Sequence, residues 1–317
     1  MVEDMLAEAG IPRAQVTGVT PLAGGTFNEV SRVTLADGRR LILKVPPPPD
    51  APALAYERGI LRTEALFYEL AAPNPWLPAV THTGFGRDGA PDFLLMTELP
   101  GQPWPAVAGQ IGDSQRRRLR GELGRIVAGL HGTTGSKFGY PARPLTASWR
   151  TAFGDMLATI LAEADQYRVT LPLPTGVIRQ RAARHEGVLD EVTTPVLVHF
   201  DLWDGNILVD LDGEAPRIGG LIDAERALWG DPLADFVSLA LLGDIRQDEA
   251  FLAGYRDAGG PARLDASSRV RLALYRSYLY LIMLVEAVPR GYDASRRGWL
   301  ERRVTPVLAA ELDQLRT

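Results

Sequence analysis

The most informative stretch of the chain places histidine, aspartate and asparagine at fixed spacing between two apolar segments. It reads Val196-Leu197-Val198-His199-Phe200-Asp201-Leu202-Trp203-Asp204-Gly205-Asn206-Ile207-Leu208-Val209, and a third apolar segment ends in Asp223. Phosphoryl transfer needs a carboxylate at the acceptor hydroxyl, and an amide oxygen and a second carboxylate that hold Mg²⁺ on the nucleotide phosphates. We therefore predict that Asp201 is the catalytic base and that Asn206 and Asp223 are metal ligands of a kinase.

Lysine is rare in this chain, which makes its position informative. Of 34 lysines and arginines only Lys44 and Lys137 are lysines, and Lys44 lies in the apolar segment Leu41-Ile42-Leu43-Lys44-Val45. A solvated lysine is not expected there, so we predict that Lys44 binds nucleotide phosphates. Lys137 lies in a glycine-containing loop, and coding bias explains it equally well.

Small residues precede Lys44 in the segment Leu22-Ala23-Gly24-Gly25-Thr26-Phe27-Asn28. Their backbone N–H groups could approach phosphates closely. We predict nucleotide contacts from Gly24, Gly25, Thr26 and Asn28, although an isolated Gly-Gly pair is more often a hairpin turn.

A buried lysine needs a carboxylate, and Glu57 and Glu64 are seven residues apart, on one face of an expected helix. We favour Glu64, because Glu57 lies near the helix start, where an acid commonly serves the helix dipole. Further along, the segment around Met96, Glu98 and Leu99 is expected to present a backbone acceptor and donor to the adenine edge; by itself it is an ordinary edge strand.

Other polar residues near the catalytic segment receive weaker assignments. Trp203, Asp204 and Glu225 are candidate acceptor contacts, but a packed tryptophan and a solvated aspartate explain the first two equally well. His199 is expected to hold the loop through backbone hydrogen bonds. Asp231, before proline, is expected to cap a helix.

Composition limits the classes of protein that fit. The chain has 317 residues, 46% hydrophobic and 23% charged, and a formal charge of −5, which indicates an ordinary globular protein without the basic surface of a nucleic-acid partner. It contains no cysteine and shows neither a signal peptide nor an apolar stretch long enough for a membrane. A cytoplasmic protein with no membrane partner is expected.

Apolar periodicity and turn residues predict two unequal parts. Residues 16–45 should form strands with a hairpin turn at Asp37-Gly38, followed by a helix over 53–71 and strands over 79–85 and 93–98. After a hinge at residues 101–105, helices are expected over 112–130, 148–167, 270–288 and 300–315, with short strands over 196–209 and 217–223. This divides the chain into an N-lobe, 1–100, and a catalytic C-lobe, 101–317.

In this order, the glycine loop, Lys44, Glu64, the 96–101 connector, Leu130-His131-Gly132, the catalytic loop and Ile222-Asp223 with Gly230-Asp231-Pro232 resemble the aminoglycoside phosphotransferase family. The resemblance covers about residues 15 to 245. It implies an α+β, bilobal protein-kinase-like fold, with an antiparallel sheet and one helix in the N-lobe and a mainly helical C-lobe. Two departures stand out: Phe200 occupies the place where many members carry glycine, and Ala224-Glu225-Arg226 follows Asp223.

The resemblance also implies Mg²⁺ as cofactor, ATP as co-substrate with GTP as an alternative, a small-molecule acceptor, and a monomer or homodimer. The first hypothesis is a kinase of an aminoglycoside or related antibiotic, hence a resistance enzyme. The second is a metabolic kinase of an amino sugar, a fructosamine-type adduct or another small alcohol. A third, of a different class, is an inactive kinase-fold module that only binds ligand.

Overall fold

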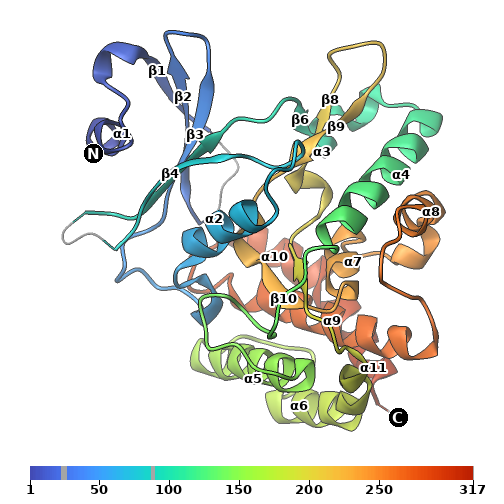
Figure 1. Ribbon diagram of the computed structural model, residues 1–317. Helices are drawn as coiled ribbons and strands as arrows, with labels where there is room; N and C mark the ends of the chain where they lie inside the picture. Colours follow the sequence, from blue (N-terminus) through green and yellow to red (C-terminus); the bar gives the residue numbers. More distant parts are fainter. Residues whose placement is uncertain (23–26, 87–89, 317) are drawn as a thin grey trace.

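The computed structural model describes residues 1–22, 27–86 and 90–316, and it has two parts with the segments predicted to be catalytic between them (Figure 1). The first part is built on a five-stranded antiparallel sheet of order β1-β2-β3-β5-β4. Its strands are β1 (Val16–Pro21), β2 (Glu29–Leu35), β3 (Arg40–Val45), β4 (Val80–Gly84) and β5 (Phe93–Thr97). The expected antiparallel sheet is confirmed.

Alternation along β3 sends its side chains to opposite faces of the sheet. Leu41 and Leu43 are buried in a small core with Met5 and Leu6 of the N-terminal helix α1 (Val2–Glu8). The hairpin before β3 turns where expected, with Gly38 at φ +87°, a conformation that glycine adopts readily.

The helix expected over residues 53–71 is two separate pieces. A short 3₁₀ turn covers Ala55–Glu57, and helix α2 covers Ile60–Leu70. Gly59 between them has φ +80°, a left-handed conformation that ends one helical segment before the next begins. The seven-residue spacing had suggested that Glu57 and Glu64 share one face of a helix. This expectation is wrong, because the two residues lie on separate helical segments.

The second part is mainly helical. Its helices are α3 (Trp104–Val107), α4 (Asp113–Leu130), α5 (Trp149–Gln166), α6 (Thr175–Arg184), α7 (Leu233–Leu239), α8 (Glu249–Asp257), α9 (Ala266–Val285), α10 (Ala294–Arg303) and α11 (Thr305–Gln314). The helix expected over 300–315 is interrupted at Val304, where α10 ends and α11 begins with proline at its second position. The proposed lobe boundary at residue 100 falls between β5 and β6.

Five short strands carry the segments predicted to be catalytic. They form one sheet of order β6-β8-β9 and one of order β10-β7. Their bounds are β6 (Gln102–Pro103), β7 (Val196–Val198), β8 (Ile207–Asp210), β9 (Arg217–Leu221) and β10 (Leu228–Gly230). The turns between them, rather than the strands, bear the polar residues of the site.

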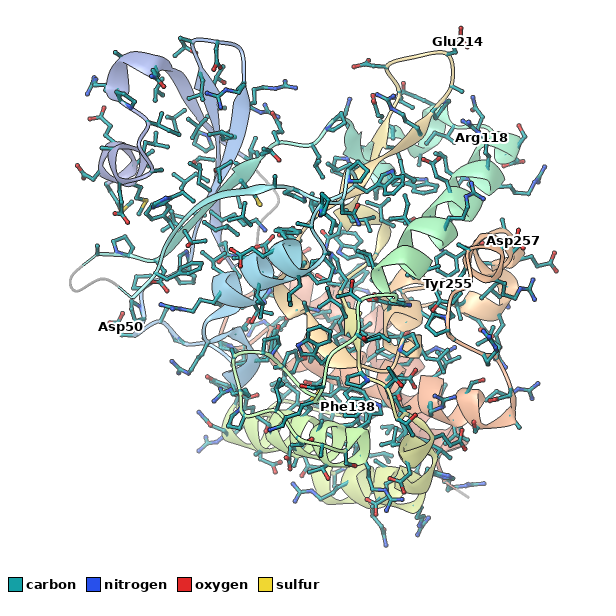
Figure 2. All side chains as sticks on the ribbon, viewed as in Figure 1. Asp50, Arg118, Phe138, Glu214, Tyr255 and Asp257 are labelled. Carbon is teal, nitrogen blue, oxygen red and sulfur yellow. The ribbon has the colours of Figure 1, made fainter. Side chains whose placement is uncertain are left out.

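The core of the helical part centres on α9, whose apolar side chains from Leu272 to Val285 are almost all buried. Burying one such side chain contributes roughly 1.5–3 kcal/mol, so this helix fixes the positions of its neighbours. In Figure 2, Phe138 and Tyr255 lie within the helical part, whereas Asp50, after β3, and Glu214 lie at the periphery of the molecule and are exposed. Among the described residues, no helix is both long and apolar enough to cross a membrane.

Candidate active site

The loop that carries Asp201 connects β7 to β8, and the buried carboxylate of Asp235 holds its first residues. Asp235 of α7 accepts hydrogen bonds from the backbone N–H of His199 (3.1 Å) and of Phe200 (2.6 Å). The imidazole Nε2 of His131 also lies 2.9 Å from Asp235. Sequence reasoning missed Asp235, although an acidic residue four positions after Asp231 on a helix start was a visible signal.

His199 holds the loop through backbone groups, as its position at the strand end predicted. Its Nδ1 accepts from the N–H of Asp201 at 3.3 Å, so Nε2 is the protonated nitrogen and donates to the carbonyl of Ile222 at 3.0 Å. The imidazole thereby joins the segment that carries Asp201 to the segment that ends in Asp223. Its role is positional.

Phe200 adopts φ +63°, a left-handed conformation that glycine adopts without steric cost. This conformation explains why glycine is common at the corresponding place in proteins that the chain resembles. Here the phenyl ring compensates by packing at 5.8 Å, centroid to centroid, against Tyr278, and it is buried. The loop therefore holds this conformation with phenylalanine in that place.

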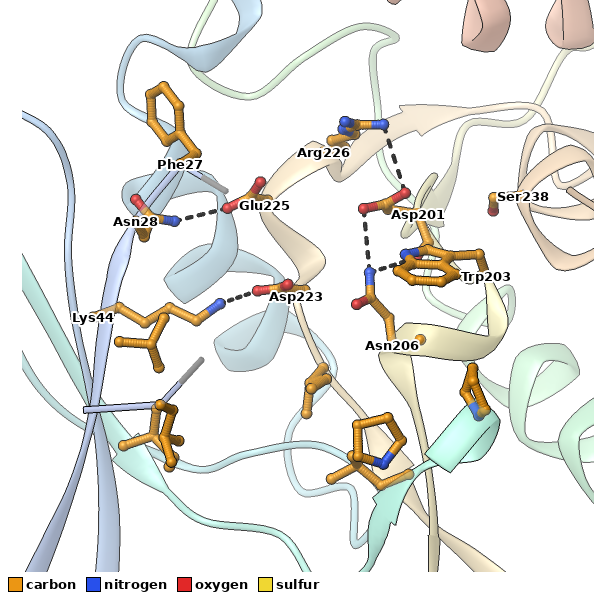
Figure 3. A pocket seen from close by; sticks show the side chains of 18 of the residues that line it. Phe27, Asn28, Lys44, Asp201, Trp203, Asn206, Asp223, Glu225, Arg226 and Ser238 are labelled. Carbon is orange, nitrogen blue, oxygen red and sulfur yellow. Dashed lines mark hydrogen bonds and ion pairs between the residues drawn. The ribbon is translucent and has the colours of Figure 1, made fainter. Parts of the chain in front are cut away.

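Asp201 and Asn206 lie side by side (Figure 3). The amide Nδ2 of Asn206 donates to the Asp201 carbonyl at 2.8 Å and to its Oδ2 at 3.2 Å. Burial raises the pKa of the Asp201 carboxyl, and the nearby Arg226 guanidinium, 3.6 Å from Oδ1, opposes that rise. Arg226 was not predicted, and its position three residues after Asp223 was its only signal in the sequence.

Lys44 lies at the junction of the two parts, on the face of β3 opposite to the small core. Its Nζ donates to both carboxylate oxygens of Glu64, at 2.7 and 2.9 Å, and is also paired with Asp223. Burial alone would lower the pKa of the ammonium, but the Asp223 and Glu64 carboxylates outweigh burial and raise it. For Asp223, burial would raise the pKa, and Lys44 reverses the direction so that it is lowered.

The structure places Glu64, rather than Glu57, beside Lys44. Glu57 is buried elsewhere, where it accepts from Arg290 Nε at 2.6 Å and from the backbone N–H of Leu54 at 2.6 Å. It is thus part of a separate network that joins the segment before α2 to the C-terminal helices.

Glu225 follows Asp223 by two positions and faces the same space. Its Oε2 accepts from Asn28 Nδ2 at 2.8 Å, which connects the end of the glycine loop to the segment after Asp223 (Figure 3). Burial, and then the charge of Asp223, raise the pKa of Glu225 to about 8 in spite of Lys44. Gly24, Gly25 and Thr26 lie outside the described residues.

Carboxylate and amide oxygens that suit Mg²⁺ converge at this point. One oxygen each from Glu64, Asp223 and Glu225 lies within 4.8 Å of the others. Glu64 is committed to Lys44, so Asp223, Glu225 and the amide oxygen of Asn206 are the groups that fit a divalent cation.

The connector after β5 has an unused backbone donor. The side chain of Glu98 pairs with Arg32 (2.8 Å) and Arg40 (2.9 Å), and its N–H donates to the Arg40 carbonyl. Among the described residues, the next N–H, that of Leu99, has no acceptor. Leu99, with the buried Met96, is therefore the part of the connector that fits an adenine edge.

Several acids that lie near or after the catalytic loop in the sequence line a different hollow. Asp204 points into a second hollow with Asp248, where both lie near Arg120, at 3.6 Å and 2.5 Å. Asp244 lines the same hollow and pairs with Arg246. The side chain of Asp204 does not line the main cavity, so the structure does not bring this candidate acceptor residue together with Asp201.

A cavity of about 880 Å³ runs between the sheet and the C-terminal helices. Its lining includes the site residues discussed above, namely Asn28, Lys44, Met96, Glu98, Leu99, Asp201, Trp203, Asn206, Asp223, Glu225 and Arg226. Glu286 and Arg290 also line it and were not predicted, because their proximity arises from the path of α9 and not from any local motif.

The model of the phosphotransferase enzyme family, APH, matches residues 18–272. The chain belongs to this family. It is also 23% identical over 296 residues to a probable ketoamine kinase of Enterococcus faecium, covering 89% of this chain and 94% of that protein. With these relatives and the protein-kinase-like fold, the chain is a small-molecule kinase.

Solved structures show the same fold at low identity. A putative fructosamine-3-kinase from Thermobifida fusca matches with a TM-score of 0.64 and 22% identity, over 95% of this chain and 98% of that chain. The APH(2″)-IIa enzyme, solved with streptomycin and ATP, matches with a TM-score of 0.61 and 14% identity, over 98% and 97%. The bilobal, protein-kinase-like architecture of this member of the phosphotransferase family is thus confirmed.

Proposed function

We propose that this kinase transfers the γ-phosphate of ATP to a hydroxyl group of a sugar-derived small molecule. The observation that carries this proposal is the convergence of Lys44, Asp201, Asn206 and Asp223 on one cavity. A module that only binds a ligand has no need of all four.

Each of the four groups has a distinct task. Asp201 accepts the proton of the acceptor hydroxyl, or orients that hydroxyl until the proton is lost. Asn206, bonded to Asp201 through Nδ2, keeps its amide oxygen for metal, and Asp223 offers a carboxylate to the same ion. Lys44, held by Glu64, would compensate charge on the nucleotide phosphates, and Asp223, its second partner, is the carboxylate that would also hold the metal.

Mg²⁺, when bound, would neutralise charge on the phosphates and align the reacting oxygens. Asp223 and Asn206 would hold it, with Glu225 as a neighbouring carboxylate. The Leu99 N–H would bind the adenine edge. GTP is an alternative co-substrate, because backbone contacts alone give weak selection between purines.

For the acceptor, we favour a ketoamine or a similar sugar-derived alcohol over an aminoglycoside. A polycationic acceptor needs uncompensated acids near Asp201. Of five acids that lie near or after the catalytic loop in the sequence (Asp204, Glu225, Asp244, Asp248 and Glu249), only Glu225 lines the cavity, and its raised pKa favours the uncharged form. The acceptor end is lined instead by Arg226, Arg290 and Arg296.

The test is a phosphotransfer assay with ATP, GTP and Mg²⁺ against ketoamines, amino sugars and aminoglycosides, followed by mass spectrometry of the acceptor. We expect a phosphate ester on a ketoamine or related sugar alcohol. Efficient phosphorylation of streptomycin or gentamicin, without activity on any ketoamine, would reject this acceptor class and favour the antibiotic-resistance role.

A further inference from the structure

One end of the cavity is formed by residues late in the sequence, from α9, α10 and the turn between them. Met283, Glu286, Tyr292, Arg296 and Trp299 line it there. None of these side chains has a part in the phosphoryl-transfer chemistry described above. They belong to a region where acceptor recognition, rather than nucleotide binding, is expected.

Two partly exposed tryptophans line this cavity. Trp203, two residues after Asp201, is 40% exposed, and Trp299 of α10 is 42% exposed. No other described aromatic side chain is among the exposed large hydrophobic ones. Exposed indole faces in a cavity are suited to stack on a sugar ring or another flat ring, because that contact removes apolar area from water.

The charges at this end are unequally compensated. Arg226 pairs with Glu286 at 2.8 Å and lies near Asp201, and Arg290 pairs with Glu57 and Glu286. Arg296 is different: its guanidinium lies over the Tyr292 ring at 3.9 Å and makes no ion pair within the described part of the chain. Among the described residues, Arg296 is thus the one arginine at this end of the cavity without a carboxylate partner, and its guanidinium packs on an aromatic ring.

We infer that Arg296, with Trp203 and Trp299, forms an acceptor subsite for a molecule that carries both a ring and a carboxylate. A planar guanidinium binds a carboxylate through two parallel hydrogen bonds, which gives orientation as well as affinity. A ketoamine formed from a sugar and a free amino acid has both features. This inference rests on the proposed function and narrows its acceptor to glycated amino acids.

The competing explanation is that Arg296 binds a nucleotide phosphate. The two explanations predict different kinetic effects. A phosphate contact would make the KM for ATP rise when Arg296 is neutralised, whereas an acceptor contact would change only the KM for the acceptor.

The experiment compares two matched acceptors, N-(1-deoxyfructosyl)glycine and its glycinamide, which differ only in the carboxylate. The proteins are the parental chain, Arg296→Gln and the control Arg297→Gln. Arg297 is the exposed neighbour on α10 and does not line the cavity. A second pair, Trp299→Ala and Trp299→Phe, tests the stacking surface.

We expect the parental enzyme to prefer the carboxylate compound by about tenfold or more in kcat/KM, because even one of the two charge-assisted hydrogen bonds is worth about that factor. Arg296→Gln should abolish that preference and leave the KM for ATP unchanged, and Arg297→Gln should keep it. Trp299→Ala should raise the KM for both acceptors. Trp299→Phe keeps an aromatic ring and should leave both KM values close to those of the parental enzyme.

Equal turnover of both compounds by the parental enzyme, or a raised KM for ATP in Arg296→Gln, would overturn the subsite while leaving the proposed function standing. Absence of turnover for both compounds, together with phosphorylation of another acceptor class, would overturn the proposed acceptor and the subsite with it.

Discussion

Asn206 Nδ2 donates to Asp201 Oδ2 over 3.2 Å, so the residue expected to hold metal also fixes the residue expected to meet the acceptor. Because Nδ2 is engaged, the amide oxygen of Asn206 is the atom left for a cation. One side chain, that of Asn206, therefore connects the expected proton acceptor with the expected metal site. A substitution that disturbs the metal site should also change the position of the Asp201 carboxylate.

Asp223→Ala should abolish productive binding of metal with nucleotide, because it removes a charged ligand. Asn206→Ala should weaken this binding but not abolish it, because it removes a neutral ligand. Mn²⁺ binding followed by electron paramagnetic resonance, with a non-hydrolysable ATP analogue, measures this directly. Asn206→Ala should also lower kcat, since Asp201 loses its partner. Unchanged Mn²⁺ affinity in Asp223→Ala would contradict the metal site.

Lys44→Arg should be nearly as inactive as Lys44→Ala. The ammonium lies between two oxygens of Glu64 and the carboxylate of Asp223 in a buried position. A planar guanidinium on a longer stem does not fit that space. Steady-state kinetics, with circular dichroism to verify folding, tests the prediction, and parental activity in Lys44→Arg would show that the ammonium geometry is unimportant.

Phe200→Gly should destabilise the protein although it relieves backbone strain. Loss of the buried ring costs about 3–5 kcal/mol, whereas relief of a left-handed conformation returns about 1–2 kcal/mol. The matched control is Arg168→Gly, because Arg168 has φ +54° but is exposed. Urea unfolding should show a net loss of about 2 kcal/mol for the first variant and a small gain for the second; a stabilised Phe200→Gly would mean that the ring contributes little.

The stability of the nucleotide-free protein should fall as pH rises from about 5 to 8. Glu225 ionises near pH 4.3 in an unfolded chain, and its pKa in the folded protein is raised to about 8. Between these values the folded state binds more protons than the unfolded state, so the free energy of unfolding decreases with rising pH.

Glu225→Gln removes this proton uptake and should flatten the decline. Urea midpoints at several pH values, without metal or nucleotide, provide the measurement. A decline of the same slope in Glu225→Gln would assign it to other groups.

The sequence was informative wherever a function depends on local spacing. The catalytic loop, Lys44 on its strand and the backbone role of His199 all follow from motifs within a few residues. The division of the 53–71 helix at Gly59 was missed, because a single glycine is tolerated inside a helix and its left-handed φ is not visible in the pattern.

Contacts across long separations could not be predicted. Arg290 and Glu57 are 233 residues apart, and Arg226 and Glu286 are 60 apart. The direction of a side chain was equally hidden in the sequence: Asp204 is three residues from Asp201, yet its side chain lies near Arg120 in the second hollow and does not line the main cavity. The direction in which an acidic side chain points, rather than its distance from Asp201 in the sequence, decides whether it can contact an acceptor in the cavity.

The central claim is tested most directly by Asp201→Asn, with ATP, Mg²⁺ and a ketoamine that the parental enzyme phosphorylates. Loss of the base should lower kcat by about 10²–10⁴, while the affinity for ATP, measured by calorimetry, stays near the parental value. A variant that keeps parental kcat, or loses activity only because ATP no longer binds, would contradict the assignment of Asp201 to the acceptor hydroxyl.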